Sequence, residues 1–341
     1  MKQRTLIIAE AGVNHNGSLK NAKRLIDIAA KSEANIVKFQ TFISSDLVVP
    51  YAKKAKYQLK NTKKKENQLE MLLKYELSFK DIKILFNYAK RKKIEFLSTA
   101  FDLKSFDLLK KLKLKRYKIA SGEINNYPLL VKIGKENKRT ILSTGMSDIN
   151  DIKIAVNTLL KNGLHKKKLS ILQCTTEYPV PFNSVNLKAM HHIKKVFPGI
   201  DVGFSDHTLG IEASVAAVAM GAKIIEKHIT LNKKMKGPDH KSSLEPKELV
   251  NLIRSVRNVE NALGKPIKTL QSVEKKNKLV ARKSLVAKKK IEKNDKFSEN
   301  NLGTKRPGSG ISPMKWNILI GKKSKQNYKI NQLISKKEIS N

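Results

Sequence analysis

The sequence predicts an α/β protein, a (β/α)8 barrel followed by a small C-terminal domain. Three observations support this prediction. Eight short runs rich in branched apolar residues recur along the chain, amphipathic segments of helical periodicity separate them, and polar residues cluster where the runs end. Continuous apolar strands that alternate with helices indicate a parallel sheet buried on both faces. Eight such units within about 260 residues suit a closed barrel.

The apolar runs give the expected strands, and the segments between them give the expected helices. SLKNAKRLIDIAAKSE, SFDLLKKLKL and IEASVAAVAMGA are typical of these amphipathic segments. A doubly wound open sheet is the alternative, but the glycine-rich nucleotide fingerprint is absent after the first run. The expected strands are Leu6–Gly12, Ile36–Phe42, Ile94–Phe101, Tyr117–Ser121, Thr140–Gly145, Leu169–Thr175, Val202–Thr208 and Ile224–Thr230.

Two parts of the chain depart from this alternation. The long segment Ile43–Tyr75 is expected to pass over the face formed by the strand ends, because loops of this length usually have a function or are mobile. A last barrel helix ends at Gly264, a suitable helix C-cap. We therefore expect a barrel domain over 1–264, a polar linker over 265–280 and a small domain of short strands and turns over 281–341.

The composition excludes several classes of protein. A formal net charge of +41 allows nucleic-acid binding, but the lysines are spread over the whole chain and no zinc-finger or RNP-type signature is present. The positive field would instead help to attract an anionic substrate. Cys174 is the only cysteine, which fits a reducing compartment. No apolar run approaches the roughly 20 residues that span a bilayer, and the chain enters directly into a strand, so a cytoplasmic protein is expected.

Polar side chains stand where the expected strands end. In a barrel, those ends form the catalytic face. His207 in GFSDHTLG and His228 in IIEKHITL follow consecutive strands, so their imidazoles are expected to share one divalent metal. A single histidine would more often be a satisfied core residue, but two at successive strand ends favour a metal site. Imidazole suits manganese and zinc alike, so the ligands alone do not select the metal.

Two lysines interrupt strongly apolar strands. In a chain with this many lysines, a solvated surface charge is the ordinary interpretation of any one of them. Lys38 and Lys118, however, lie within runs where an unpaired charge would be costly. Two lysines together with hydroxyl groups at neighbouring strand ends would form a preorganised site for an anion.

Ten motifs occur in a characteristic order: IAEAGVNHNGS, KFQTF, STAFD, YKIASGE, LSTGM, CTTEYP, GFSDHT, EKHIT, GPDHKSSLEP and KRPGSGISP. Together they resemble the sialic acid (nonulosonate) synthase family, from residue 6 to about residue 320, including its C-terminal antifreeze-like (SAF) domain. The resemblance implies condensation of phosphoenolpyruvate with an N-acylated mannose-type sugar, giving a nine-carbon 2-keto acid and phosphate. It also implies a divalent metal, manganese or magnesium, and a domain-swapped homodimer in which one chain's small domain caps the other chain's barrel.

The resemblance also implies roles for individual residues. Glu123 would deprotonate the attacking water, Glu10 and Asp239 would be carboxylates on the sugar side, and Arg306 would cross the dimer to the N-acyl group. Gln40 and Tyr178 would be further sugar contacts. The family often has asparagine where this chain has Thr176, a shorter side chain for the same phosphate contact. The implied phosphoenolpyruvate pocket consists of Lys38, Thr99, Lys118, Ser121 and Ser205.

Details within the motifs favour one branch of the family. The stretches TTEYP, NSVNLKAM and GISPMKW look more like the N,N'-diacetyllegionaminate branch, which uses a 2,4-diacetamido-2,4,6-trideoxymannose, than the N-acetylneuraminate branch, which uses N-acetylmannosamine. A pseudaminate synthase is a third possibility. Another phosphoenolpyruvate-dependent 2-keto sugar acid synthase is disfavoured by the intact small domain. A non-catalytic ice- or carbohydrate-binding protein is disfavoured by the charged strand ends.

Overall fold

The computed structural model describes residues 4–62 and 66–340. Within the segment Ile43–Tyr75, residues 63–65 lie outside the described residues, as does Asn341 at the end of the expected small domain. The chain divides into two compact units, one ending at Gly264 and one beginning at Lys265. Each unit is described by itself.

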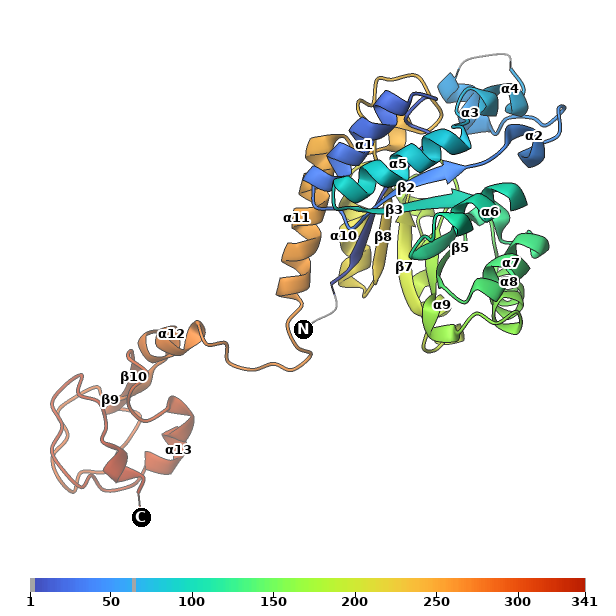
Figure 1. Ribbon diagram of the computed structural model, residues 1–341. Helices are drawn as coiled ribbons and strands as arrows, with labels where there is room; N and C mark the ends of the chain where they lie inside the picture. Colours follow the sequence, from blue (N-terminus) through green and yellow to red (C-terminus); the bar gives the residue numbers. More distant parts are fainter. Residues whose placement is uncertain (1–3, 63–65, 341) are drawn as a thin grey trace. The chain divides into compact units, whose positions relative to one another are not determined.

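The first unit is a closed barrel of eight parallel strands, in the order β1 to β8 (Figure 1). This confirms the predicted (β/α)8 fold and excludes the open doubly wound sheet. Each strand starts within one residue of its expected start. The strands are β1 (Leu6–Gly12), β2 (Ile36–Thr41), β3 (Glu95–Ala100), β4 (Arg116–Ile119), β5 (Arg139–Ser143), β6 (Leu169–Cys174), β7 (Asp201–Asp206) and β8 (Ile224–His228).

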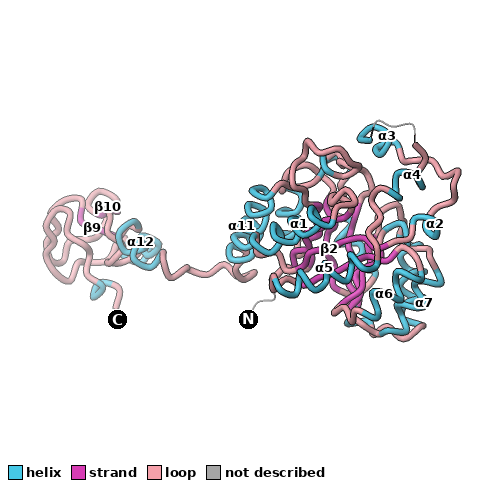
Figure 2. Tube along the Cα trace, turned by 45° about the horizontal axis from the view of Figure 1, so that its top comes forward, coloured by secondary structure: helices cyan, strands magenta, loops and turns pink. Residues whose placement is uncertain are grey.

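A ring of helices covers the outside of the barrel (Figure 2). Ser18, Asp102 and Asp148 each cap a helix by accepting a hydrogen bond from a backbone N–H in its first turn. None of the described helices is long and apolar enough to cross a membrane. The barrel helices are α1 (Leu19–Lys31), α5 (Phe79–Arg91), α6 (Leu103–Lys111), α7 (Tyr127–Glu136), α8 (Ile149–Lys161), α9 (Ala189–Val196), α10 (Glu212–Ala219) and α11 (Pro246–Ala262).

The expected excursion after β2 contains three short helices, α2 (Ser44–Leu47), α3 (Lys56–Thr62) and α4 (Gln68–Leu73). All three lie beyond the carboxyl end of β2 (Figure 1). The backbone N–H of Ser44 donates to Glu76 Oε2 at 2.8 Å, so the two ends of the excursion are tied together. The segment is therefore an ordered cover attached to the barrel over the residues that are described.

The barrel interior is built in layers. One layer is apolar and consists of Ile8, Ile36, Leu97, Ile141, Leu172 and Ile224. Because strand side chains alternate between the two faces, the residue two positions further along each strand also points inward. Five of those residues are polar or charged (Glu10, Lys38, Thr99, Ser143 and Glu226), and the sixth is Cys174. An apolar floor thus supports a polar layer at the carboxyl ends of the strands.

The second unit has its own small core. Strand β9 (Ser284–Ala287) pairs antiparallel with β10 (Leu302–Lys305), and helices α12 (Glu274–Ala281) and α13 (Trp316–Leu319) complete its longer elements. Helix α12 occupies the second half of the segment expected to be a linker. The core consists of Leu285, Ala287, Ile291, Phe297, Leu302, Ile311, Leu319, Tyr328 and Ile334.

The short 3-10 helices of the two units, among the described residues, are η1 (Ser121–Glu123), η2 (Lys166–Lys168), η3 (Phe182–Ser184), η4 (His240–Ser242), η5 (Pro313–Lys315) and η6 (Lys336–Glu338).

Candidate active site

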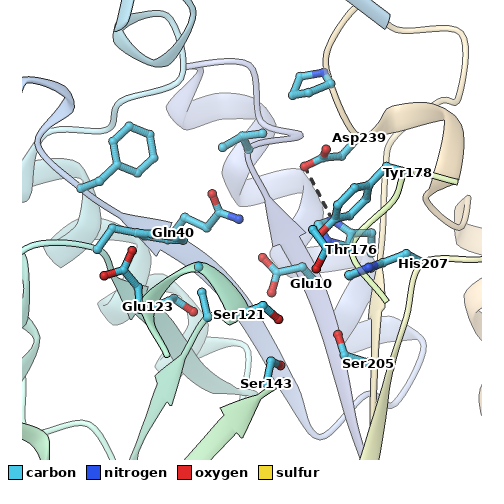
Figure 3. Close-up of a pocket in the computed structure, with 18 of the residues that line it drawn as sticks. Glu10, Gln40, Ser121, Glu123, Ser143, Thr176, Tyr178, Ser205, His207 and Asp239 are labelled. Carbon is cyan, nitrogen blue, oxygen red and sulfur yellow. Dashed lines mark ion pairs between the residues drawn. The ribbon is translucent and has the colours of Figure 1, made fainter. Parts of the chain in front are cut away.

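A cavity of about 290 Å³ lies at the carboxyl ends of the barrel strands. Every one of the eight strands contributes a lining side chain, and Figure 3 shows several of them, including Glu10, Gln40, Ser143 and Ser205, pointing into the same space. The expected site residues that line it are Glu10, Lys38, Gln40, Thr99, Lys118, Ser121, Glu123, Thr176, Tyr178, Ser205, His207, His228 and Asp239. The structure therefore brings all but one of the residues expected from the sequence into one cavity.

The two lysines lie at the bottom of the cavity, where they are buried. Lys38 Nζ forms ion pairs with Glu10 and with Glu226, the latter at 3.7 Å, and donates to Thr99 Oγ1 at 3.3 Å. Lys118 Nζ lies 3.5 Å from Glu226 Oε1. Glu226 thus holds both ammonium groups toward one point of the cavity. With this arrangement neither buried cation is left without an opposite charge.

Hydroxyl groups complete this cluster. Lys118 Nζ donates to Ser143 Oγ at 2.7 Å, and Ser205 Oγ donates to Glu226 Oε1 at 3.1 Å. The attraction of Lys118 and Lys38 outweighs burial and lowers the pKa of Glu226 below its ordinary value. The two ammonium groups and the hydroxyl groups of Ser143 and Ser205 therefore form a cluster suited to binding a small anion.

Glu10 lies in the polar layer beside both lysines and His228. Burial raises the pKa of Glu10 to about 7, although the positive charge of Lys38 opposes this shift. The strand register pairs Glu10 with Lys38 on one side and with His228 on the other. Glu10 therefore stands between the lysine cluster and the histidines.

Ser121, Thr176 and Gly145 converge on one wall of the cavity. The Gly145 backbone N–H donates to Ser121 Oγ at 2.9 Å. A Cβ atom at Gly145 would collide with Thr176 Oγ1 and come within 2.9 Å of Ser121 Oγ. Thr176 Oγ1 is buried and has no hydrogen-bond partner among the described residues. An unpaired buried hydroxyl facing a cavity is free to donate to a bound oxyanion.

Glu123 follows the end of β4 on the 3-10 helix η1 and is buried. Asn126 Nδ2 donates to Glu123 Oε2 at 2.7 Å. Burial raises the pKa of Glu123, and the hydrogen bond from Asn126 opposes this shift by stabilising the ionised form. A carboxylate that is held in place and has a raised pKa is suited to accept a proton.

His207 and His228 lie side by side, with ring centroids 5.5 Å apart. Because a carbonyl oxygen can only accept, His207 Nδ1–H donates to the Thr175 carbonyl at 2.8 Å, a contact that orients metal-binding imidazoles in other proteins. His228 Nδ1 is buried without a hydrogen-bond partner in the described part of the chain. Burial is the main reason that the pKa of His228 lies well below its ordinary value, and the nearby His207 lowers it further. The imidazole of His228 is therefore neutral.

These two rings fit a divalent cation. Both are buried and adjacent, and one has a buried nitrogen that no described protein group satisfies. Within residues 4–62 and 66–340, no group of three or more His, Cys, Asp or Glu side chains is arranged to hold a metal ion. Two histidines would thus be the main protein ligands, and the remaining coordination positions would be open to substrate and water, as in a catalytic site.

Asp239 and two tyrosines form the upper part of the cavity. Asp239 Oδ2 lies 4.0 Å from His228 Nδ1, the pair joined by a dashed line in Figure 3. Burial raises the pKa of Asp239 to about 6. The Tyr178 ring lies 4.1 Å from the His207 ring, and the Tyr57 ring of helix α3 lies 4.9 Å from Tyr178. The excursion after β2 therefore touches the histidine end of the cavity through Tyr57.

The sequence argument did not single out several of the lining residues. Glu226, Ser143 and Cys174 all belong to the polar layer, and their signal was their position two residues after an apolar residue on each strand. Tyr57 had no such signal, because it comes from a segment without a strand or helix repeat. The position of Tyr57 depends on how the long excursion folds against the barrel.

Arg306 is the one expected residue that does not line the cavity. It belongs to the second unit, follows β10 and is exposed.

A closed parallel barrel with two lysines, several carboxylates and two histidines at its carboxyl ends defines an enzyme of the (β/α)8 class. A small unit with an antiparallel strand pair follows it. The chain belongs to the NeuB family, whose profile matches residues 25–268, and a SAF domain profile matches residues 282–340. Both matches confirm the resemblance inferred from the motifs.

Individual relatives agree with this assignment. The chain is 55% identical to N,N'-diacetyllegionaminic acid synthase of Campylobacter jejuni subsp. jejuni, over 97% of this chain and 99% of the relative. It is 38% identical to N-acetylneuraminate-9-phosphate synthase of Homo sapiens, over 93% of this chain and 88% of the relative. The crystal structure of N-acetylneuraminic acid synthetase from Leptospira borgpetersenii, in complex with citrate, matches with a TM-score of 0.70 and 33% identity, over 80% of this chain and 90% of that chain.

Proposed function

We propose that this protein is a nonulosonate synthase that condenses phosphoenolpyruvate with an N-acylated mannosamine-type sugar and water. The products are a nine-carbon 2-keto acid and phosphate. The observation that carries the proposal is the polar layer of a NeuB-family barrel, where two buried lysines and two adjacent imidazoles face one cavity. The lysines suit an anionic enol phosphate, and the imidazoles suit the cation that an aldehyde acceptor requires.

Phosphoenolpyruvate is expected at the lysine end of the cavity. Its carboxylate and phosphate need cations and neutral donors, which Lys38, Lys118 and the surrounding hydroxyls supply. The unpaired hydroxyl of Thr176 offers a further donor for a phosphate oxygen. Thr176 lies against Gly145 with an unpaired hydroxyl, which would donate to the phosphate in place of the family's asparagine.

The sugar is expected at the histidine end. His207 and His228 would hold a divalent cation, manganese or magnesium by family resemblance, which when bound supplies Lewis-acid polarisation of the sugar's aldehyde oxygen. Asp239, Glu10, Gln40 and Tyr178 line the same cavity and would provide carboxylate, amide and hydroxyl groups for the sugar's substituents. The two substrates would therefore meet above the polar layer.

The condensation joins the vinyl carbon of phosphoenolpyruvate to the aldehyde carbon. This leaves an oxocarbenium-like centre at the carbon that carries the phosphate, and water adds there. Glu123, with its raised pKa, accepts the proton of this water. Phosphate then leaves as the bond between that carbon and the phosphate oxygen breaks. The added hydroxyl loses its proton to give the keto group, and the former aldehyde oxygen takes up a proton to become a hydroxyl group.

The sugar is 2,4-diacetamido-2,4,6-trideoxymannose in this proposal, and the product is N,N'-diacetyllegionaminate. Identity to the legionaminic acid synthase of C. jejuni is 55%, against 38% to the human neuraminate-9-phosphate synthase. Both alignments span nearly the whole of this chain, so the difference reflects similarity throughout the protein. N-acetylmannosamine is the second candidate, supported by the similarity to the Leptospira synthetase.

The assembly and location are also part of the proposal. A domain-swapped homodimer would place the SAF domain of one chain over the barrel of its partner, and Arg306 would then contact the N-acyl group of the sugar. A small biosynthetic substrate pair and a single buried cysteine fit a cytoplasmic enzyme.

Phosphate release from phosphoenolpyruvate tests the proposal. The full chain is assayed with the diacetamido sugar, with N-acetylmannosamine and with the acceptor of pseudaminate synthase, with and without manganese. The expected result is metal-dependent release with the highest kcat/KM for the diacetamido sugar. A higher kcat/KM for N-acetylmannosamine would move the enzyme to the other branch, and no release with any acylated sugar would remove the synthase assignment.

A further inference from the structure

An ion pair that is fully buried lies directly behind the two histidines. Lys227 Nζ lies 3.0 Å from Asp206 Oδ2, and the exposed fractions of the two residues are 1% and 0%. Asp206 ends β7, Lys227 lies on β8, and the strand register pairs them directly. Asp206 directly precedes His207, and Lys227 directly precedes His228. Neither Asp206 nor Lys227 lines the cavity.

Strand alternation explains this placement. Successive side chains of a barrel strand point to opposite faces. His207 and His228 face the cavity, so Asp206 and Lys227 point to the outer side of the barrel wall. There, Ser214 Oγ of helix α10 donates to Asp206 Oδ2 at 2.6 Å. The pair therefore ties two strands and a helix together at the height of the histidines.

Asp206 and Lys227 also form hydrogen bonds that hold the residues on both sides of His207. Asp206 Oδ1 accepts from both the N–H and the hydroxyl of Thr208, each at 2.8 Å. Lys227 Nζ donates to the Thr208 carbonyl at 2.6 Å. The residue before His207 and the residue after it are thus fixed to β8, one position from His228.

Stability alone does not account for such a pair. Replacing a buried ion pair with packed apolar side chains is often neutral or stabilising, because the cost of removing two charges from water is large. The best-attested use of buried polar groups is to specify one register or arrangement. Here the arrangement specified is that of two adjacent strand ends, each of which carries an imidazole.

We propose that this pair is a positioning device that fixes the separation of His207 and His228 and thereby sets the affinity for the divalent cation. The inference rests on the proposed function, since it takes the two histidines as the cation's ligands. Groups that orient metal ligands change metal affinity by roughly 10–100-fold when they are mutated. We expect an effect of that size without any direct contact between the pair and the cation.

Manganese binding to the purified full chain, measured by calorimetry, tests the inference. Asp206→Asn and Lys227→Met are each expected to weaken manganese binding by roughly 10–100-fold. Phosphoenolpyruvate binding, measured without metal, is expected to stay within about twofold, because the lysine cluster is held by Glu226. A single variant that leaves one buried charge can fail to fold, so the double variant Asp206→Asn/Lys227→Met, which removes both charges, is measured as well.

Arg116→Met provides the matched control. Arg116 pairs with Glu95 across neighbouring strands at the opposite end of the barrel, with a distance of 2.6 Å. This variant is expected to lower the melting temperature while manganese affinity is unchanged. Wild-type manganese affinity in the folded double variant would overturn the inference. Equal losses of manganese and phosphoenolpyruvate binding would also overturn it, since they would indicate general structural support.

Manganese binding to His207→Ala distinguishes a failure of this inference from a failure of the proposed metal site. Manganese uptake that is lost in His207→Ala supports the metal site, and the Asp206 and Lys227 variants then test positioning alone. Manganese uptake that persists unchanged in His207→Ala would remove the metal site, and the inference would fall with it.

Discussion

Single residues in the polar layer take their environment from the strand register. Glu10 stands between Lys38 and His228 because β1 lies between β2 and β8 in the closed barrel. Its pKa of about 7 results from burial, with Lys38 opposing the shift. Glu226 lies beside Lys38 and Lys118, and their positive charges lower its pKa. The surroundings of the two carboxyl groups thus shift the pKa of the same residue type in opposite directions.

His207→Ala and His228→Ala are each expected to abolish turnover and leave the fold intact. Each change removes one of two proposed metal ligands, and neither side chain belongs to the apolar core. Steady-state rates with saturating manganese are compared with circular dichroism of the same samples. Near-normal rates in either folded variant would contradict the metal site.

Glu123 gives a prediction about pH. As a proton acceptor it works only when ionised, and burial raises its pKa above the ordinary 4.5. The ionised fraction, and with it kcat/KM, should therefore fall as the pH drops through a value above 4.5. Glu123→Gln should lower kcat by about 10²–10⁴-fold, the usual contribution of a general base. A pH–rate profile of the wild type and the rate of the variant check both statements.

A neighbouring substitution tests the sign of this shift. Asn126→Asp keeps the side-chain oxygen that caps α7, but removes the N–H that donates to Glu123 and adds a negative charge. Both changes favour protonated Glu123, so the acidic limb of the pH profile should move to higher pH. An acidic limb that stays in place would show that another group controls it.

Among the elements, helix α3 has the clearest connection to the site. Asn61 Nδ2 donates to the Pro238 carbonyl at 2.7 Å, next to Asp239. On the same helix, the Tyr57 ring lies against Tyr178. The helix is therefore attached at two points to the loops that border the histidine end of the cavity. This position lets α3 contact a sugar without approaching the lysine cluster.

Tyr57→Ala is expected to raise the KM for the sugar by roughly 2–10-fold, the value of a lost aromatic contact. The KM for phosphoenolpyruvate should stay unchanged. Leu59→Ala is the matched control, because Leu59 lies on the same helix, is 49% exposed and does not line the cavity. If the two variants show the same sugar KM, Tyr57 has no part in sugar binding.

The sequence was most informative about elements with a regular repeat. Eight apolar runs predicted the eight strands, and closure of the barrel then brought the strand-end residues into one cavity. The excursion after β2 could not be predicted in detail, because its helices α2, α3 and α4 are short and its contacts with the barrel are long-range. Glu226 was overlooked for another reason: its strand position marks it as inward-facing, but its role depends on lysine partners on other strands, and the sequence alone does not identify these partners.

At the scale of the whole molecule, the barrel contains the expected site except for Arg306. The second unit has a core of its own, so it can keep its fold wherever it is placed. A swapped dimer is the arrangement in which Arg306 would act on the sugar of a second chain. The high positive charge, +41, would attract the anionic substrate at long range in either arrangement.

Arg306→Ala is expected to raise the KM for the sugar by about 10-fold or more, the cost of a lost charge-assisted hydrogen bond. The KM for phosphoenolpyruvate should change little. Mixing this variant with His207→Ala chains provides a stronger test. In a swapped dimer, one of the two sites of a mixed dimer has both residues intact, so activity should return on mixing. Equal losses for both substrates, with no recovery on mixing, would make Arg306 a structural residue of its own unit.

The central claim is that this cavity joins an enol phosphate to an acylated sugar aldehyde. The most direct measurement is the balance of the reaction with 2,4-diacetamido-2,4,6-trideoxymannose and manganese, followed by phosphate assay and mass spectrometry. We predict one phosphate and one nine-carbon 2-keto acid for each phosphoenolpyruvate consumed. Phosphate release without a nine-carbon product, or no consumption of phosphoenolpyruvate with any acylated mannosamine, would contradict the claim.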